Sequence, residues 1–288
     1  MTEFLAASSG TLTNVALNIL RLALWLVIIS AVFVPLERVL SLHNQKIWRK
    51  AALVDLGYYF LNALLLGATL AIPLAGVAWL LHFIVPSSVQ ALGAGLPGPV
   101  KFVAALVLGE IGGYWGHRVQ HEVPWLWRLH AIHHSAEQID FMVNVRAHPL
   151  DLLITRITGY IPLYAFGLLT PFPSASDPAL VAFLFGGTLW AYFIHANIRV
   201  RFGWLEHVLA SPAYHHWHHT KHDHVNHNYA TVLPFVDRLF GTHHLPKDKW
   251  PEEYGTDTKV PESLPHQLVY PFLPEERAPA GDKAPAPR

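Results

Sequence analysis

The chain has 288 residues and no formal net charge, with 52% hydrophobic and only 14% charged residues. Soluble domains carry about a quarter of charged residues, so this balance favours a membrane protein and offers no basic surface for a nucleic-acid partner. The absence of cysteine excludes disulfides, thiolate metal sites and a cysteine nucleophile, so any metal must be bound through nitrogen and oxygen.

Long apolar runs predict membrane-spanning helices, because about 20 apolar residues cross the hydrocarbon core. The runs lie at 15–36, 53–84, 100–115, 152–170 and 179–196. The first is expected to be retained, since neither a basic start nor a small-residue cleavage site marks a signal peptide. The second is expected to kink at Pro73, and the third must continue beyond Trp115 into polar sequence.

The fourth and fifth runs are joined by residues 171–178, a proline-rich connector that predicts a hairpin. The sequence therefore predicts an all-α, polytopic membrane protein with about four to five transmembrane helices and a cytosolic histidine-rich catalytic cap. A soluble protein with unusually apolar helices is the alternative. Three regions are expected: an N-terminal transmembrane region at 1–99, a catalytic domain including the hairpin at 100–255, and a C-terminal extension at 256–288. The end of this extension, 275–288, is expected to be disordered.

Basic residues set the expected orientation in the membrane. Lysine and arginine occur in the connector after the first run, in residues 116–151 and at the start of the C-terminal region, whereas 1–14, 84–99 and 171–178 contain none. Because loops rich in these residues stay on the cytoplasmic side, the N-terminus is expected outside and every histidine cluster inside. An integral position in a bacterial inner membrane is the expected location.

The chain has 20 histidines, and three tight groups of them predict a metal centre. On a helix, residues three and four positions apart share a face, close enough for two imidazoles to reach one ion. Adjacent histidines diverge by about 100° and can serve two neighbouring ions. A further histidine at the inner end of the fifth run is costly there unless it is functional. The predicted ligands are His117, His121, His130, His133, His134, His215, His218 and His219 from the three groups, with His195 as the ninth.

The number and type of these ligands favour two iron ions. Imidazole suits zinc, copper, iron and nickel. A structural zinc site closes with four ligands, so eight clustered imidazoles are too many for one ion. The Glu-x-x-His pattern of ferritin-like di-iron proteins is missing, which indicates a different, histidine-rich class. Zinc can replace iron in purified protein.

Other residues near the groups have expected secondary roles. Glu110 lies seven residues before His117, and a carboxylate at that depth typically fixes the free ring N–H of a metal-bound histidine. A packing partner for Arg118 or a neighbouring tyrosine is the alternative. His216 lies outside the pattern of its group and is expected not to bind metal. The sequence leaves open whether four more histidines join the site: His148, His222, His224 and His227.

These motifs resemble the fatty acid hydroxylase/sterol desaturase superfamily of membrane-bound non-haem di-iron enzymes. The similarity covers roughly residues 100–255 and includes Tyr114-Trp115-Gly116-His117-Arg118, the second histidine group, Arg146-Ala147-His148-Pro149-Leu150, Phe193-Ile194-His195-Ala196-Asn197, the third histidine group, Asn228-Tyr229 and Asp237-Arg238-Leu239-Phe240-Gly241-Thr242. The resemblance implies two irons, held by the nine histidines, and molecular oxygen as co-substrate. Glu110 and Asn228 are the expected catalytic residues.

The resemblance also implies hydroxylation or desaturation of an unactivated C–H bond in a membrane lipid. Val236 stands where relatives often have tryptophan, and Ala230 where glycine often follows Asn-Tyr. These departures leave open a sterol-like ring, a fatty acyl chain, an ether lipid or a carotenoid. A histidine-rich metal-binding or transport protein without oxygenase activity is the alternative function, and a zinc-dependent membrane hydrolase is a third.

Electron delivery requires an external partner, because no flavin, nicotinamide or haem motif is visible. A ferredoxin or a cytochrome-type protein is expected, with a docking surface at Arg201, Lys221 and Lys247. The lipid chain is expected to reach the centre along Tyr114, Trp115, Trp190 and Phe193, although core packing is the alternative for each of them. The sequence does not define the oligomeric state.

Overall fold

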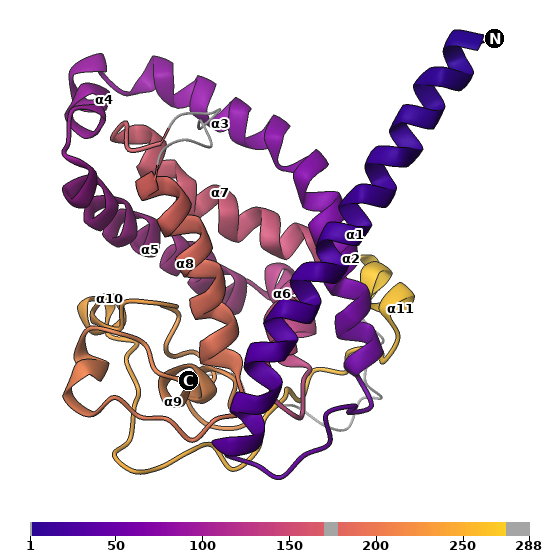
Figure 1. The fold of residues 1–288 in the computed structure, drawn as a ribbon. Helices are drawn as coiled ribbons and strands as arrows, with labels where there is room; N and C mark the ends of the chain where they lie inside the picture. The colour runs from indigo at the N-terminus through magenta and orange to yellow at the C-terminus, as the bar shows by residue number, and fades with distance from the viewer. Residues whose placement is uncertain (1, 170–177, 275–288) are drawn as a thin grey trace.

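The computed structural model describes residues 2–169 and 178–274, and in this part of the chain it is all-helical (Figure 1). Apart from two isolated β-bridges, Ser41 with Ile198 and Thr220 with Tyr254, the described residues form no strand pairing. The elements are α1 (Thr2–Val39), α2 (Ala52–Thr69), α3 (Ala71–Ile84), α4 (Ser87–Ala94), α5 (Gly98–Glu122), α6 (Pro124–His134), η1 (Phe141–Val145), α7 (Pro149–Ala165), α8 (Pro178–His195), η2 (Gly203–His207), α9 (Pro212–His218), α10 (Phe235–Phe240), α11 (Leu264–Val269) and η3 (Tyr270–Phe272).

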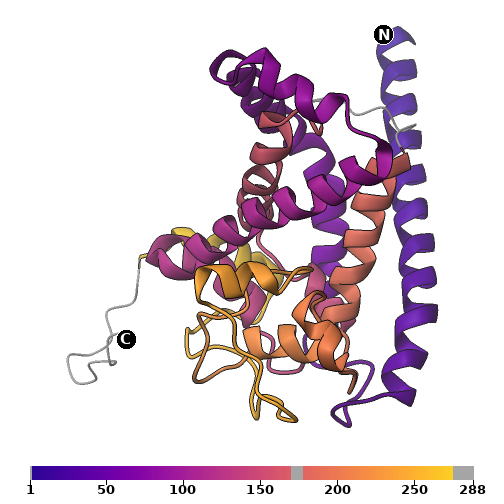
Figure 2. The ribbon, with the colours of Figure 1, turned by 90° about the vertical axis from the view of Figure 1, so that its left-hand side faces the viewer.

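The long apolar helices form one half of the molecule, and the histidine-bearing short helices and loops form the other (Figures 1 and 2). The N-terminal part of α1 extends beyond the other helices (Figure 1). Within the described residues, Thr13–Val39 is the one segment both long and apolar enough to cross a membrane. Ala52–Leu65 and Ala71–Ile84 are apolar but shorter. The expected four to five spans therefore remain a prediction.

Most helix boundaries agree with the expected runs. The expected kink before Pro73 is confirmed: α2 ends at Thr69 and α3 begins at Ala71, because proline has no N–H to bond the preceding turn. The third run does continue past Trp115, since α5 reaches Glu122. Residues 170–177, which hold most of the expected hairpin connector, and the tail 275–288 lie outside the described residues. Although α7 and α8 follow each other, α7 packs mainly on α5 and α3, and α8 packs mainly on η1 and α9.

Glycines allow α5 and α7 to approach closely, and this contact fixes the helix that carries His117. A Cβ atom on Gly112 would lie 2.3 Å from the carbonyl oxygen of Thr158, and one on Gly116 would overlap the Thr158 hydroxyl. Gly113, on another side of α5, has open space around it. Small residues four positions apart are typical of closely packed membrane helices.

We therefore expect Gly112→Ala to destabilise the protein by about 1–3 kcal/mol, because the added methyl group forces α5 away from α7. Gly113→Ala is the matched control and should be neutral or stabilising, since alanine is the better helix former. Thermal unfolding of the two variants in detergent measures the difference. Equal melting temperatures would show that the two helices can separate without cost.

A buried ion-pair network joins the N-terminal helices to the histidine region. Arg49 donates to Asp55 and, at 2.6 and 2.8 Å, to the two carboxylate oxygens of Asp140. Arg146 donates to the other oxygen of Asp55 at 2.6 Å. In the same region, Glu37 of α1 accepts the backbone N–H groups of Phe141 and Asn197. Buried charges are stable only when paired in this way, so these contacts fix the segment before α7.

Candidate metal centre

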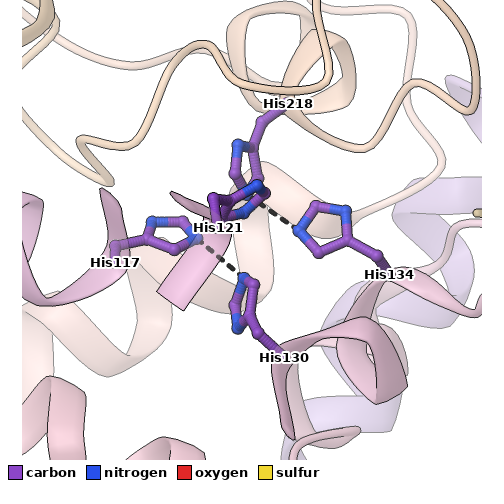
Figure 3. Close-up of side chains that lie close together, drawn as sticks. All are labelled: His117, His121, His130, His134 and His218. Carbon is purple, nitrogen blue, oxygen red and sulfur yellow. Dashed lines mark hydrogen bonds between the residues drawn. The ribbon is translucent and has the colours of Figure 1, made fainter. Parts of the chain in front are cut away.

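Four helices bring the nine predicted ligands together. Every one of these side chains is buried, with at most 8% of its surface exposed. They form two groups, and within each group the potential ligand atoms lie within 4.8 Å of one another. The five-histidine group contains His117, His121, His130, His134 and His218 (Figure 3). The four-histidine group contains His133, His195, His215 and His219.

The division follows from helical geometry. Adjacent residues on a helix point about 100° apart, so the neighbours His133 and His134 enter different groups. His218, the last residue of α9, and the following His219 are divided in the same way. Adjacent histidines therefore lie in two neighbouring groups, while their binding of two neighbouring ions remains a prediction. His195, which comes from α8, lies in the four-histidine group as expected.

The outer nitrogen of several rings is held by a group that can only accept a hydrogen bond. The Nδ1 atoms of His117, His133, His195 and His218 contact the carbonyl oxygens of Tyr229, Arg146, Ala191 and His227 at 2.7, 3.0, 2.7 and 2.8 Å. The Nδ1 atom of His130 contacts a carboxylate oxygen of Asp151 at 2.9 Å. Each of these Nδ1 atoms must therefore carry the hydrogen, and in a neutral ring Nε2 is left as a lone pair.

These lone pairs face one another. The Nε2 atoms of His117 and His130 are 3.0 Å apart, and those of His133 and His195 are 3.3 Å apart. Neither member of such a pair has a hydrogen to donate, so the contacts are repulsive without a cation. Two imidazole nitrogens bound to one ion at about 2.0–2.1 Å lie roughly 2.9–3.4 Å apart at tetrahedral or octahedral angles. The donor set therefore fits one ion in each group.

Burial keeps these rings neutral. It lowers the pKa of His133, His134, His215, His218 and His219 well below the ordinary value of about 6.5, and neighbouring imidazoles lower each pKa further. Metal ions bind the neutral ring, so the same burial that disfavours protonation keeps the ligands ready at neutral pH.

The lowered pKa values predict that the metal-free protein loses stability as the pH falls below about 6.5. The unfolded chain then binds protons on these histidines, whereas the folded chain does not. Each ring therefore lowers the free energy of unfolding by up to about 1.4 kcal/mol per pH unit. Above that pH both states are neutral and the effect vanishes. Denaturant unfolding of the metal-free protein at about pH 7.5 and 5.5 measures this. An unchanged free energy of unfolding would contradict the burial of neutral rings.

Asp151 is a functional residue that the sequence interpretation missed. It is buried in the first turn of α7, where its Oδ1 atom contacts His130 and also accepts from the side-chain amide of Gln120. Carboxylates that hold a metal-binding histidine fix its tautomer and ring orientation. The available signal was one carboxylate at the start of an apolar run, two residues after the His148-Pro149 pair.

The contacts expected for Glu110 are wrong. Its carboxylate accepts the backbone N–H groups of Val232 and Leu233 at 2.6 and 3.1 Å, and its described partners include neither a histidine nor Arg118. Seven residues separate it from His117, which is about 10 Å along a helix and too far for contact with that ring. Glu110 therefore anchors the loop before α10.

Asn228, expected to be catalytic, also makes structural contacts. Its side-chain Nδ2 atom donates to the carbonyl oxygens of Tyr214 and His244. Its Oδ1 atom accepts the backbone N–H of His244 at 2.7 Å. Its backbone has a positive φ of 58°, a conformation that asparagine tolerates better than most residues. These contacts tie Asn228 to α9 and to the segment after α10, and the catalytic role expected for it remains a prediction.

Asp237 connects this loop to the ligands. Its buried carboxylate accepts the N–H groups of Tyr229 and Ala230, both at 2.8 Å, the hydroxyl of Thr242 at 2.7 Å, and the hydroxyl of Tyr214. Tyr229 supplies the carbonyl oxygen that contacts His117, and Tyr214 precedes His215 in α9. Asp237 therefore positions ligands of both groups through their neighbours.

The histidines left open by the sequence lie outside both groups. His148 caps α7 by accepting the N–H of Leu150. His222 is exposed and pairs with Glu253 at 3.4 Å, and the ring of His224 stacks on His244 with 3.6 Å between centroids. The carbonyl of His227 contacts His218, but its ring belongs to neither group.

His216 also lies outside both groups, as expected. Its ring is completely buried, and burial lowers its pKa to about 3. It contacts the hydroxyl of Tyr254 at 3.0 Å and the carbonyl oxygen of Ala196 at 3.1 Å. His216 therefore has a structural place beside the centre.

The side chains proposed for lipid access are mostly packed against other rings. Tyr114 is buried and stacks on Phe240, and Phe193 stacks on Phe202. Trp190 packs beside Phe193, so these contacts favour core packing. Trp115 differs, because 44% of its surface is exposed.

Two of the three basic residues expected to dock an electron donor already have acidic partners. Arg201 pairs with Glu206 at 3.1 Å, and Lys221 lies 3.6 Å from Glu253. Lys221 also lines a polar cavity of about 450 Å³, while Lys247 is exposed. This surface is therefore less basic than its sequence indicates.

Comparison with known proteins places the centre within a family. Residues 102–242 match the fatty acid hydroxylase family model. The chain is 35% identical to ornithine lipid hydroxylase OlsE of Rhizobium tropici over 180 residues, covering 61% of this chain and 51% of that protein. It is 30% identical to alkylglycerol monooxygenase of Homo sapiens over 152 residues, covering 52% of this chain and 32% of that protein. A Delta(7)-sterol-C5(6)-desaturase of Nicotiana tabacum is 30% identical over 141 residues, covering 48% of this chain and 47% of that protein.

The chain thus matches about half the length of the first of these relatives and about a third of the second. No solved structure matches.

Proposed function

Because this chain belongs to the fatty acid hydroxylase superfamily through residues 102–242, we propose that it is an oxygen-dependent di-iron oxidoreductase acting on a membrane lipid. The observation that carries the proposal is the pair of buried histidine groups in which unprotonated Nε2 atoms face one another. Nine imidazoles without carboxylate or thiolate ligands suit iron. Zinc can occupy the same positions in purified protein.

Two iron ions bound here would supply the activation of molecular oxygen and the removal of hydrogen from an unactivated carbon. The chain positions and shields the ions. Five Nδ1 atoms are fixed by carbonyl oxygens or by Asp151, so the Nε2 atoms point inward before a metal arrives. Trp127 and Tyr229 lie 5.1 Å from the ring of His121 and help to exclude water. The two electrons per turnover come from an external donor of ferredoxin or cytochrome type.

We favour hydroxylation of a lipid with a long acyl or alkyl chain. Two of the three relatives reported above are named as an ornithine lipid hydroxylase and an alkylglycerol monooxygenase, while the third is named as a sterol desaturase. The proposed location is a bacterial inner membrane, with several helices spanning it and the histidine groups on the cytoplasmic side. A metal-binding or transport role without oxygen chemistry is the competing function, and no specific observation on the described residues favours it.

Lipid mass spectrometry of cells that express the wild type or His218→Ala tests the proposal. The Nε2 atom of His218 lies 3.1 Å from that of His134 within the five-histidine group. Its loss should therefore reduce the amount of lipid product by more than about 100-fold. The exposed His222 provides the control, since His222→Ala should leave the lipid profile unchanged.

A lipid heavier by one oxygen in the wild type identifies a hydroxylase, and one lighter by two hydrogens identifies a desaturase. Identical lipid profiles, or purified protein with one zinc per chain and no oxygen consumption after reduction, would contradict the proposed function.

A further inference from the structure

The short elements η2 and α10 share an exposed apolar surface that the metal centre does not use. Trp204 is 74% exposed and Leu239 is 65% exposed. We call this surface the η2–α10 patch; its members are Trp204, Leu205, Val208, Phe235 and Leu239. Exposed apolar side chains gathered on two joined elements in this way mark an interaction surface.

Polar contacts hold the two elements together as one platform. The guanidinium of Arg238 in α10 donates to the carbonyl oxygens of His207 and Glu206 at 3.0 and 3.4 Å. The N–H of Ala210, just after η2, donates to the carbonyl oxygen of Val232 at 2.9 Å, before α10. Backbone groups that would otherwise need water are therefore paired, and the exposed side chains of the two elements are apolar except for His207 and Arg238.

The patch continues onto the exposed face of α5. Phe240 stacks on Tyr114 with 4.9 Å between ring centroids and lies 5.1 Å from Trp115. Trp115 and Val119 are four residues apart on one face of α5, and they are 44% and 38% exposed. Figure 2 shows α10 beneath α5, and the ring contacts of Phe240 with Tyr114 and Trp115 join the two helices.

The chemistry of this surface selects its partner. Tryptophan and phenylalanine among aliphatic side chains are typical of the boundary between lipid headgroups and acyl chains. Basic side chains occur at its edges: the Arg118 guanidinium lies 5.4 Å from the ring of Trp115 and pairs with Glu122 at 2.8 Å, and the exposed Arg238 precedes Leu239 in the chain. Arginine at such an edge suits phosphate headgroups, whereas an apolar protein partner would not require it.

We propose that the η2–α10 patch inserts into the headgroup–acyl boundary of the cytoplasmic leaflet and holds the histidine region against the bilayer. This inference depends on the membrane location proposed above, but not on the reaction. An inserted patch would place the exposed face of α5, which lies opposite His117 and His121, against the leaflet that would supply the lipid.

Single cysteines test the depth of the patch, because the chain has no cysteine of its own. The variants are Trp204→Cys and Leu239→Cys, with Leu24→Cys on the exposed face of α1 and Glu252→Cys in an exposed loop as controls. Each full-length protein is labelled with a polarity-sensitive fluorophore in phosphatidylcholine–phosphatidylglycerol vesicles. The quenchers are aqueous iodide and lipids brominated near the headgroup.

Labels at positions 204 and 239 should be quenched by the brominated lipids and severalfold less by iodide than the label at position 252. Iodide quenching at 204 and 239 equal to that at 252 would overturn the inference, as would protection from both quenchers, which would indicate a protein partner. The label at position 24 separates the two proposals: if iodide also reaches it, the membrane location itself fails.

Discussion

Replacing His195 with alanine is expected to empty the four-histidine group while the five-histidine group keeps its ion. The Nε2 atom of His195 lies 2.9 Å from that of His215 and 3.3 Å from those of His133 and His219, so it contacts every other member. Loss of a residue that merely orients a ligand costs about 10–100-fold in metal affinity or activity, so loss of the ligand should cost more than about 100-fold. Iron per chain should fall by half and oxygen consumption should fall to background.

His216→Ala is the matched control. His216 is buried in the same region, but its ring contacts Tyr254 and the Ala196 carbonyl oxygen rather than the ligands. We expect this variant to lose about 1–3 kcal/mol of stability, because a buried hydroxyl and carbonyl lose their partner, while its iron content stays unchanged. Iron analysis and unfolding of both purified proteins measure the contrast. Full iron in His195→Ala, or half of the iron in folded His216→Ala, would contradict the assignment.

The position of the histidines could be predicted because the relevant geometry is local. Spacings of three and four residues place side chains on one helical face, and this pattern selected eight of the nine members of the two groups, while His195 was selected by its position at the inner end of an apolar run. The proline-induced break between α2 and α3 was predictable for the same reason, since proline acts on its own turn. The division of adjacent residues such as His133 and His134 also follows from the 100° rotation between neighbours.

The residues that hold the rings could not be predicted, because they depend on tertiary contacts. Backbone carbonyl oxygens hold four of the Nδ1 atoms, and any residue type provides such an oxygen. Glu110 was chosen for its position on the helix of His117, yet the tertiary fold directs it to the backbone of Val232 and Leu233. Asp151 was overlooked because it is 21 residues from His130 and begins an apolar helix.

Replacing Asp151 with alanine is expected to weaken metal binding in the five-histidine group by about 10–100-fold. His130 would then lose the group that keeps hydrogen on Nδ1 and would be free to present a protonated Nε2 atom toward His117. Iron binding is measured by chelator competition, and the unfolding of the metal-free protein is measured alongside it. Asp151→Asn retains an acceptor oxygen without the charge, so its loss of affinity should be smaller.

Gln120→Leu provides the control for this effect, because Gln120 contacts Asp151 but none of the rings. It removes a buried partner of the carboxylate, so it should reduce stability while the bond between Asp151 and His130 remains. If Asp151 acts only as a favourable charge in the first turn of α7, alanine would cost about 0.3–1 kcal/mol of stability and leave iron affinity unchanged. A loss of iron affinity larger than the loss of metal-free stability therefore distinguishes a residue that orients His130 from one that only supports the helix.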